Sequence, residues 1–261
     1  MAPLGYDRYC DEILDQSGLL RYLVKGADPS APVPTCPGWT FAALVRHIGG
    51  NLRTVETAVR AGTPVSDPAT QVTGLSGPRD DDPAELDAWL SDAAEKYTAT
   101  LRQAGADGEA TVWGFQGSTP FWVRRAVHDI VVHRADAALA LGEEYAVAPD
   151  LAADAVDELL ELFAGQQAGG LPTLAELRGA GETIRLSAAD TGAAWLIALG
   201  PDGFTWRRDD TGSEDATVTV RGFLTDVLLT FYRRLPATGG RVEVRGDAGL
   251  LDFWLARASL S

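Results

Sequence analysis

The sequence predicts two domains, a bundle of four α-helices followed by a smaller α+β domain whose sheet is mostly antiparallel. Apolar residues recur at helical spacing through most of residues 1–146, whereas short alternating segments typical of strands appear only in residues 147–261. Strands interspersed with helices in the second part indicate an α+β layer. The chain has 261 residues, of which 46% are hydrophobic, so each part has enough apolar material for its own core.

Four amphipathic segments predict the helices of the first domain. In each segment, apolar residues three and four positions apart fall on one face of a helix. Thr40 has the side chain of an N-cap, Asp82-Pro83 joins a cap to a proline in the first turn, and Gly142 follows the last apolar turn. The expected helices span residues 7–25, 40–60, 82–101 and 121–141.

Two segments between these helices have no apolar period. Residues 61–82 are rich in Gly, Pro, Ser, Thr and Asp, which predicts a long loop of the kind that often forms a lid or stays disordered. Residues 105–117, which contain Trp113 and Phe115, are also expected to form a loop.

The second domain begins with another amphipathic helix and then changes to strand-like alternation. Gly200-Pro201-Asp202-Gly203 predicts a tight turn between two strands. We expect strands at residues 183–188, 194–199, 204–208, 216–221 and 241–245, and helices at residues 150–166, 222–234 and 248–258.

Charge and cysteine content exclude several classes of function. The formal net charge of −15 argues against nucleic acid and anionic membranes as partners. No window approaches the length of apolar sequence that a membrane span needs, and the start has no secretory pattern. Cys10 and Cys36 are the only cysteines and neither lies in a CxxC motif, so we expect a cytoplasmic protein without a disulfide framework.

The expected helix at residues 121–141 carries most of the candidate residues for catalysis or metal binding. Asp129 and His133 are four positions apart and share a face, Asp136 follows nearly one turn later, and His128 points roughly 100° away from Asp129. Most other positions are apolar, so the helix should be central and buried. Its imidazole and carboxylate groups then need partners. A metal ion or a His–Asp hydrogen-bonded pair would satisfy them, and the spacing alone leaves both open.

The third histidine of the chain, His47, lies beside the apolar stripe of the expected helix at residues 40–60. A lone histidine in such a place is commonly a core or boundary residue. His47 is nevertheless a candidate site residue, because histidine is scarce in this chain. In addition, its helix is expected to pack against the helix that carries His128 and His133.

Two motifs in the first domain resemble the mycothiol-dependent maleylpyruvate isomerase family of the DinB-like superfamily. They are PTCPGWTFAALVRHIGG at residues 34–50 and VHDIVVHRADA at residues 127–137. In the second domain, VTVRGFLTDVLLTFYRRLP and VEVRGDAGLLDFWL resemble the family's C-terminal domain. The resemblance implies a DinB-like four-helix bundle with a metal site, followed by a sterol-carrier-like α+β domain.

The resemblance also implies a set of site residues. His47, Asp129 and His133 would bind a divalent metal, zinc in the first place, with Asp129 standing where the family usually has glutamate. His128 would serve as an outer contact or proton carrier. Asp136 would orient His133 or form a salt bridge, with metal ligation as the less favoured alternative. An arginine of the C-terminal domain is functionally important in part of the family. Its best positional match is Arg234, with Arg233 next, as residues that bind the thiol cosubstrate. An ordinary cation at a helix end is the alternative for both arginines.

The activity implied is attack by the thiolate of mycothiol on a small electrophilic substrate, by cis–trans isomerisation or S-transfer. Aromatic residues could line the acceptor pocket or simply pack in the core, namely Trp39, Trp113, Phe115 and Trp122. Two other functions stay open at this point. A metal-dependent hydrolase would act without a thiol, and a non-catalytic protein would hold a small apolar ligand in its sheet domain.

Overall fold

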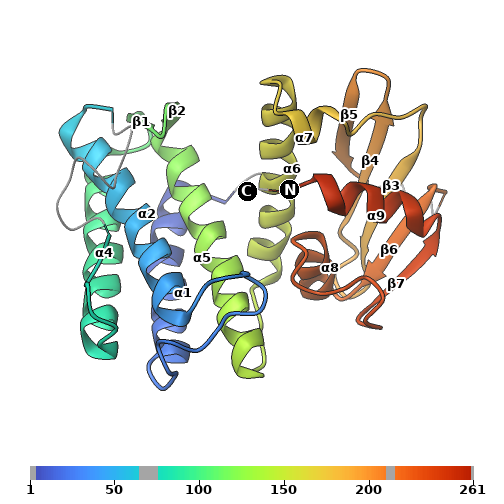
Figure 1. Ribbon diagram of the computed structural model, residues 1–261. Coiled ribbons are helices and arrows are strands. Elements are labelled where there is room, and N and C mark those ends of the chain that lie inside the picture. Colours follow the sequence, from blue (N-terminus) through green and yellow to red (C-terminus); the bar gives the residue numbers. More distant parts are fainter. Residues whose placement is uncertain (1–3, 65–75, 210–214, 260–261) are drawn as a thin grey trace. The chain divides into compact units, whose positions relative to one another are not determined.

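The computed structural model describes residues 4–64, 76–209 and 215–259, and divides the chain into two compact units, residues 1–145 and 146–261. The first unit is helical, as predicted. Its long helices lie side by side (Figure 1): α1 (Tyr6–Val24), α2 (Phe41–Ala61), α4 (Pro83–Ala104) and α5 (Thr119–Leu141). The pairs α1–α4, α1–α5, α2–α4 and α2–α5 all pack against each other, which encloses one core.

Side-chain caps set the beginnings of three of these helices. The Thr40 hydroxyl accepts from the backbone N–H of Ala43, the Asp82 carboxylate accepts from two N–H groups, and the Ser118 hydroxyl accepts from Phe121. Gly62 and Gly142 adopt left-handed conformations at the ends of α2 and α5. These contacts satisfy backbone groups that the first and last turns of a helix leave without partners.

The bundle core consists of the apolar faces that the sequence predicts. Burying one large apolar side chain of such a face stabilises the folded protein by about 1.5–3 kcal/mol. Helix α5 is buried over most of its circumference, in keeping with its central position. Across the described ranges, none of the helices combines the length and apolarity needed to cross a membrane. Fully buried side chains of the core include Ile13, Leu20, Leu44, Ile48, Leu90, Tyr97, Leu101 and Ile130.

A short hairpin precedes α5 where the sequence predicted only a loop. Strands β1 (Glu109–Val112) and β2 (Phe115–Ser118) pair antiparallel, so the loop expected at residues 105–117 was wrong in this part. Trp113 and Gly114 form the tip with φ angles of 52° and 78°, the left-handed geometry of a two-residue hairpin turn. Strands of four residues show too little alternation to be detected from sequence.

The long loop expected at residues 61–82 falls partly on residues 65–75, which lie outside the described residues. The flanking residues 62–64 and 76–82 contain neither helix nor strand.

The second unit contains a five-stranded sheet in the order β5–β4–β3–β6–β7. Only β3 and β6 pair in parallel, and the other neighbours are antiparallel, as the sequence predicted. The strands are β3 (Thr183–Ala188), β4 (Ala194–Gly200), β5 (Gly203–Arg208), β6 (Val218–Gly222) and β7 (Val242–Gly246).

Helices α8 (Leu224–Phe231) and α9 (Ala248–Arg257) pack against the sheet, and α6 (Pro149–Ala168) packs against α8, β5 and the short α7 (Pro172–Ala175) (Figure 1). The apolar sheet face beneath them is fully buried at Ile184, Trp195 and Ile197. Helix α8 is shorter than the predicted span of residues 222–234. It ends before Arg233, whose φ of 62° is left-handed and turns the chain away.

Candidate metal centre

Helices α2 and α5 bring together three side chains that the sequence singled out. His47 comes from α2, and Asp129 and His133 come from adjacent turns of α5. The Asp129 carboxylate lies between the two rings: its Oδ2 is 3.6 Å from His47 Nε2 and its Oδ1 is 3.9 Å from His133 Nε2. One donor atom from each residue falls within 4.8 Å of the others. The three residues therefore converge on one point, and we call them the triad.

Asn51 is a fourth polar residue at the triad, and the sequence analysis missed it. Its side-chain nitrogen lies 3.2 Å from Asp129 Oδ2, to which it donates, and 3.1 Å from His47 Nε2. If the same amide donates to both, His47 Nε2 is an acceptor and carries the lone pair that metal binding requires. Asn51 follows His47 by one helical turn, so its i, i+4 spacing was a signal that could have revealed it.

Trp39 packs against both imidazole rings of the triad. Its ring centroid lies 4.7 Å from that of His47, and 5.4 Å from that of His133 with an interplanar angle of 26°. This places one of the four aromatic residues considered for an acceptor pocket at the candidate site. Trp113 and Phe115 of the hairpin instead pack against Trp122 at the start of α5.

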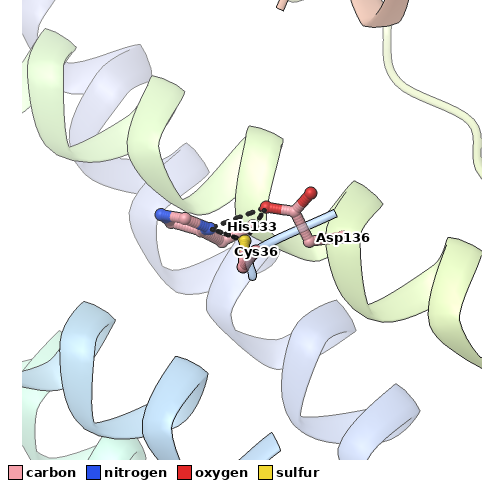
Figure 2. A group of neighbouring side chains, drawn as sticks. All are labelled: Cys36, His133 and Asp136. Carbon is pink, nitrogen blue, oxygen red and sulfur yellow. Dashed lines mark hydrogen bonds and ion pairs between the residues drawn. The ribbon is translucent and has the colours of Figure 1, made fainter. Parts of the chain in front are cut away.

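A second group of side chains lies behind His133, on the side of its other ring nitrogen. Figure 2 shows Cys36, His133 and Asp136 pointing toward one another. Asp136 Oδ2 lies 2.8 Å from His133 Nδ1 and 3.2 Å from Cys36 Sγ, and the Asp136 side chain is fully buried. Asp136 thus contacts Nδ1 of His133, the residue that the resemblance implies it orients. By donor type alone, these three residues could also hold a cation.

Electrostatics favour an ionised Asp129. Burial raises the pKa of this carboxyl, but favourable electrostatic interactions with His47, His133 and Arg125 outweigh burial and hold the pKa well below its usual range. Arg125 Nη2 lies 3.8 Å from Asp129 Oδ1, one helical turn away. An ionised carboxylate beside two imidazoles is a donor set suited to a divalent cation.

Comparison with known sequences extends over both units. The mycothiol maleylpyruvate isomerase N-terminal domain matches residues 10–138, and the C-terminal domain of the same family matches residues 150–253. The chain belongs to the mycothiol-dependent maleylpyruvate isomerase family. The resemblance stated from the motifs is thereby confirmed. A search of curated proteins found no match.

Solved structures of this family share the fold. The crystal structure of the mycothiol-dependent maleylpyruvate isomerase is 12% identical to the chain, covers 94% of it and 95% of its own length, and has a TM-score of 0.61. A histidine-to-alanine mutant of that isomerase gives a TM-score of 0.59 at the same identity and coverage. At this identity, the likeness establishes the two-part architecture alone.

The remaining family-derived site residues are His128 in the first unit and Arg233 and Arg234 in the second. His128 is fully buried on α5, with its ring 6.3 Å from that of Tyr9 on α1, and it belongs to neither donor group. Arg233 and Arg234 belong to the second unit, beyond the end of α8. The Arg233 guanidinium donates to Ser259 Oγ, and Arg234 Nη1 donates to the backbone oxygen of Tyr232.

The triad fits a divalent metal by its chemistry and spacing. Zinc–ligand distances of about 2.0–2.2 Å place two ligand atoms of a tetrahedral site roughly 3.4 Å apart. The separations of 3.6 Å and 3.9 Å between Asp129 and the two imidazole nitrogens are close to that value. The Asp129 carboxylate therefore lies where the three side chains converge, with Oδ2 toward His47 and Oδ1 toward His133.

Proposed function

We infer that this member of the mycothiol-dependent maleylpyruvate isomerase family is a divalent-metal enzyme that activates the thiol of mycothiol for attack on a small electrophilic substrate. The reaction is isomerisation, as in the family's name, or S-transfer. The observation that supports this most directly is the convergence of His47, Asp129 and His133 from α2 and α5. Zinc is the proposed ion, because two imidazoles and a carboxylate are among its common ligands.

A divalent metal held by His47, Asp129 and His133 would supply positive charge that lowers the pKa of an entering thiol and so favours its thiolate form at neutral pH. The protein residues around the triad have supporting tasks. Asp136 holds His133 by its Nδ1 atom, so that Nε2 faces Asp129. Asn51 fixes Asp129 by donating to Oδ2. Outer contacts of this kind orient ligands and raise their basicity.

Exposure of the triad indicates the direction from which a substrate can approach. The side chains of His47 and Asp129 are 33% and 24% exposed, whereas that of His133 is 9% exposed. The triad is therefore closed behind His133 and open on the side of His47. Trp39 covers one side of both rings, which excludes water there and offers an apolar surface to the substrate.

The family-derived roles of residues outside the triad belong to the same proposal. Arg234, with Arg233 next, is proposed to bind polar groups of mycothiol or substrate, since guanidinium groups suit anionic and hydroxyl-rich ligands. His128 is proposed as an outer support of α5, because its ring is buried against Tyr9 on the neighbouring helix.

The proposal is tested with protein purified without a metal-affinity tag. Elemental analysis of wild type beside His133→Ala should show a divalent metal that the variant loses. Assays with mycothiol and maleylpyruvate, and with an epoxide and an aryl halide as model electrophiles, should give isomerised product or thiol conjugates. Turnover should vanish on chelation and return when metal is added.

Two results would contradict the proposed function. Turnover that needs metal but no thiol would identify a hydrolase, since metal-bound hydroxide is the alternative nucleophile at such a site. Absence of turnover after zinc, nickel and manganese have each been restored would remove thiol activation as the function.

A further inference from the structure

Cys36 lies in a turn that the backbone holds against α5. The segment before α2 folds back on itself, with an antiparallel bridge between Pro32 and Thr40. Within it, Val33 N donates to Trp39 O, Cys36 N to Val33 O, and Trp39 N to Cys36 O, each at 2.9 Å. This turn presents Trp39 to the rings of the triad and Cys36 to the back of His133.

The hydrogen bonds at Asp136 define which atoms carry protons. Asp136 Oδ2 accepts from the Cys36 thiol, and in the ionised form of the carboxylate it also accepts from His133 Nδ1. His133 Nδ1 lies 2.8 Å from this oxygen, and Cys36 Sγ lies 3.2 Å from it. Metal binding requires a lone pair on Nε2, the atom that faces Asp129, and this places the ring proton of His133 on Nδ1. The protonated thiol and the ring thus stabilise the same buried oxygen.

A metal ion bound by Cys36, His133 and Asp136 themselves is the competing interpretation. Two ligands of one zinc ion lie roughly 3.4 Å apart. His133 Nδ1 and Asp136 Oδ2 are 2.8 Å apart, which is the length of a charge-assisted hydrogen bond and too short for a shared ion. The side chains are also nearly closed to solvent, at 8% for Cys36 and 0% for Asp136. A hydrogen-bonded chain accounts for this geometry.

We propose that Cys36 is a positioning residue of the candidate metal site, whose thiol holds the Asp136 carboxylate against His133 Nδ1 and so keeps His133 Nε2 directed at the metal. This inference rests on the proposed function. Cys36 touches neither substrate nor metal and acts through Asp136. Serine at this position keeps a donor of similar size, whereas alanine removes the donor.

Metal affinity of the full-length protein provides the first test. Zinc binding is measured by competition with a chromophoric chelator for wild type, Cys36→Ser, Cys36→Ala and Cys10→Ala. Cys10 is the matched control, because it is a buried cysteine on α1 outside both donor groups. We expect Cys36→Ala to bind zinc about tenfold more weakly, at the lower end of the range for outer contacts. Cys36→Ser and Cys10→Ala should stay near wild type.

The protonation of His133 provides a second readout that does not depend on metal. Long-range proton–nitrogen NMR of the metal-free protein should show the Nδ1–H tautomer in wild type and Cys36→Ser, and a mixture of tautomers in Cys36→Ala. If wild type binds no divalent metal, the proposed function is wrong. The NMR spectrum of the metal-free protein then tests by itself whether Cys36 positions His133. Unchanged tautomer in folded Cys36→Ala would overturn the positioning role.

Two further outcomes would also overturn the positioning role of Cys36. Equal zinc affinity of Cys36→Ala and wild type would show that the thiol does not position the site. In cobalt-loaded protein, a thiolate-to-cobalt charge-transfer band that disappears in Cys36→Ser would show that Cys36 is itself a ligand. Circular dichroism and thermal unfolding of each variant establish that the affinities compare folded proteins.

Discussion

His133 Nδ1 lies 2.8 Å from Asp136 Oδ2, while Nε2 of the same ring lies 3.9 Å from Asp129 Oδ1. One imidazole thus connects a fully buried carboxylate to a partly exposed one. In the proposed function, the buried carboxylate fixes the orientation and tautomer of the ring, and the exposed carboxylate shares the metal with it. The two nitrogens of His133 therefore have separate tasks that mutations can distinguish.

Asp136→Asn should weaken metal binding without removing a ligand. The amide keeps the size of the side chain but loses the negative charge that stabilises the proton on His133 Nδ1. The His133 ring is then held less firmly in its orientation. We expect zinc affinity to fall about 10–100-fold, measured by chelator competition. Asp15→Asn, an exposed change on α1, is the control. Wild-type affinity in folded Asp136→Asn would show that this carboxylate does not support the site.

Substitutions at Asp129 test whether its carboxylate coordinates the metal directly. Asp129→Asn keeps the shape but not the charge, and should lose more affinity than the 10–100-fold that outer contacts cost. Asp129→Glu introduces the family's usual residue, and its side chain, 24% exposed in the wild type, has room to adjust. We expect Asp129→Glu to stay within about tenfold of wild type. Equal binding by Asp129→Asn and wild type would exclude direct coordination.

The architecture was predictable from the periodicity of apolar residues, because most of its helices and strands are long or have a clear apolar pattern. Helix α5 was expected at residues 121–141 and spans Thr119–Leu141, with its end fixed by left-handed Gly142. The hairpin at residues 109–118 escaped prediction because each strand has only four residues. Its turn depends on a left-handed Trp113, a conformation that a bulky residue seldom adopts.

The candidate site was predictable only where helical spacing or family motifs place residues together. Asp129 and His133 share a face by their spacing, and His47 joined them through the resemblance. Cys36 was not predicted to contact Asp136, because it lies in a proline-rich turn without periodicity. The contact joins residues 100 positions apart, and it depends on the tertiary fold of that turn.

His128 should affect stability more than metal binding. Its ring is fully buried against Tyr9, so His128→Ala leaves a cavity in the core between α1 and α5. We expect the free energy of unfolding to fall by about 1–3 kcal/mol, with metal content unchanged. Chemical denaturation and elemental analysis measure the two quantities. Unchanged stability together with lost turnover would instead favour a proton-carrying role for His128.

The ion pair between Arg21 and Asp87 should make stability depend on pH in the acid range. The two side chains join α1 to α4 through Nε–Oδ1 at 2.7 Å and Nη2–Oδ2 at 2.9 Å. The hydrogen bond from Arg21 lowers the pKa of Asp87, against the opposing effect of burial. A carboxyl with a lowered pKa in the folded state stabilises the protein above its unfolded pKa, about 3.9. This contribution is lost as the pH falls from that value through the lowered pKa of the folded state.

Asp87→Asn in metal-free protein should therefore lower the free energy of unfolding by about 1 kcal/mol at neutral pH, the value for a partly exposed pair. The difference from wild type should shrink when the pH is lowered to about 3, because the unfolded chain then binds a proton at Asp87 that the folded state, with its lowered pKa, resists. Urea denaturation at neutral pH and at about pH 3 measures this difference in the free energy of unfolding. Asp252→Asn, at an exposed position of α9, is the control and should show a small difference at either pH. A difference for Asp87→Asn that persists in acid would assign its effect to packing between α1 and α4 rather than to charge.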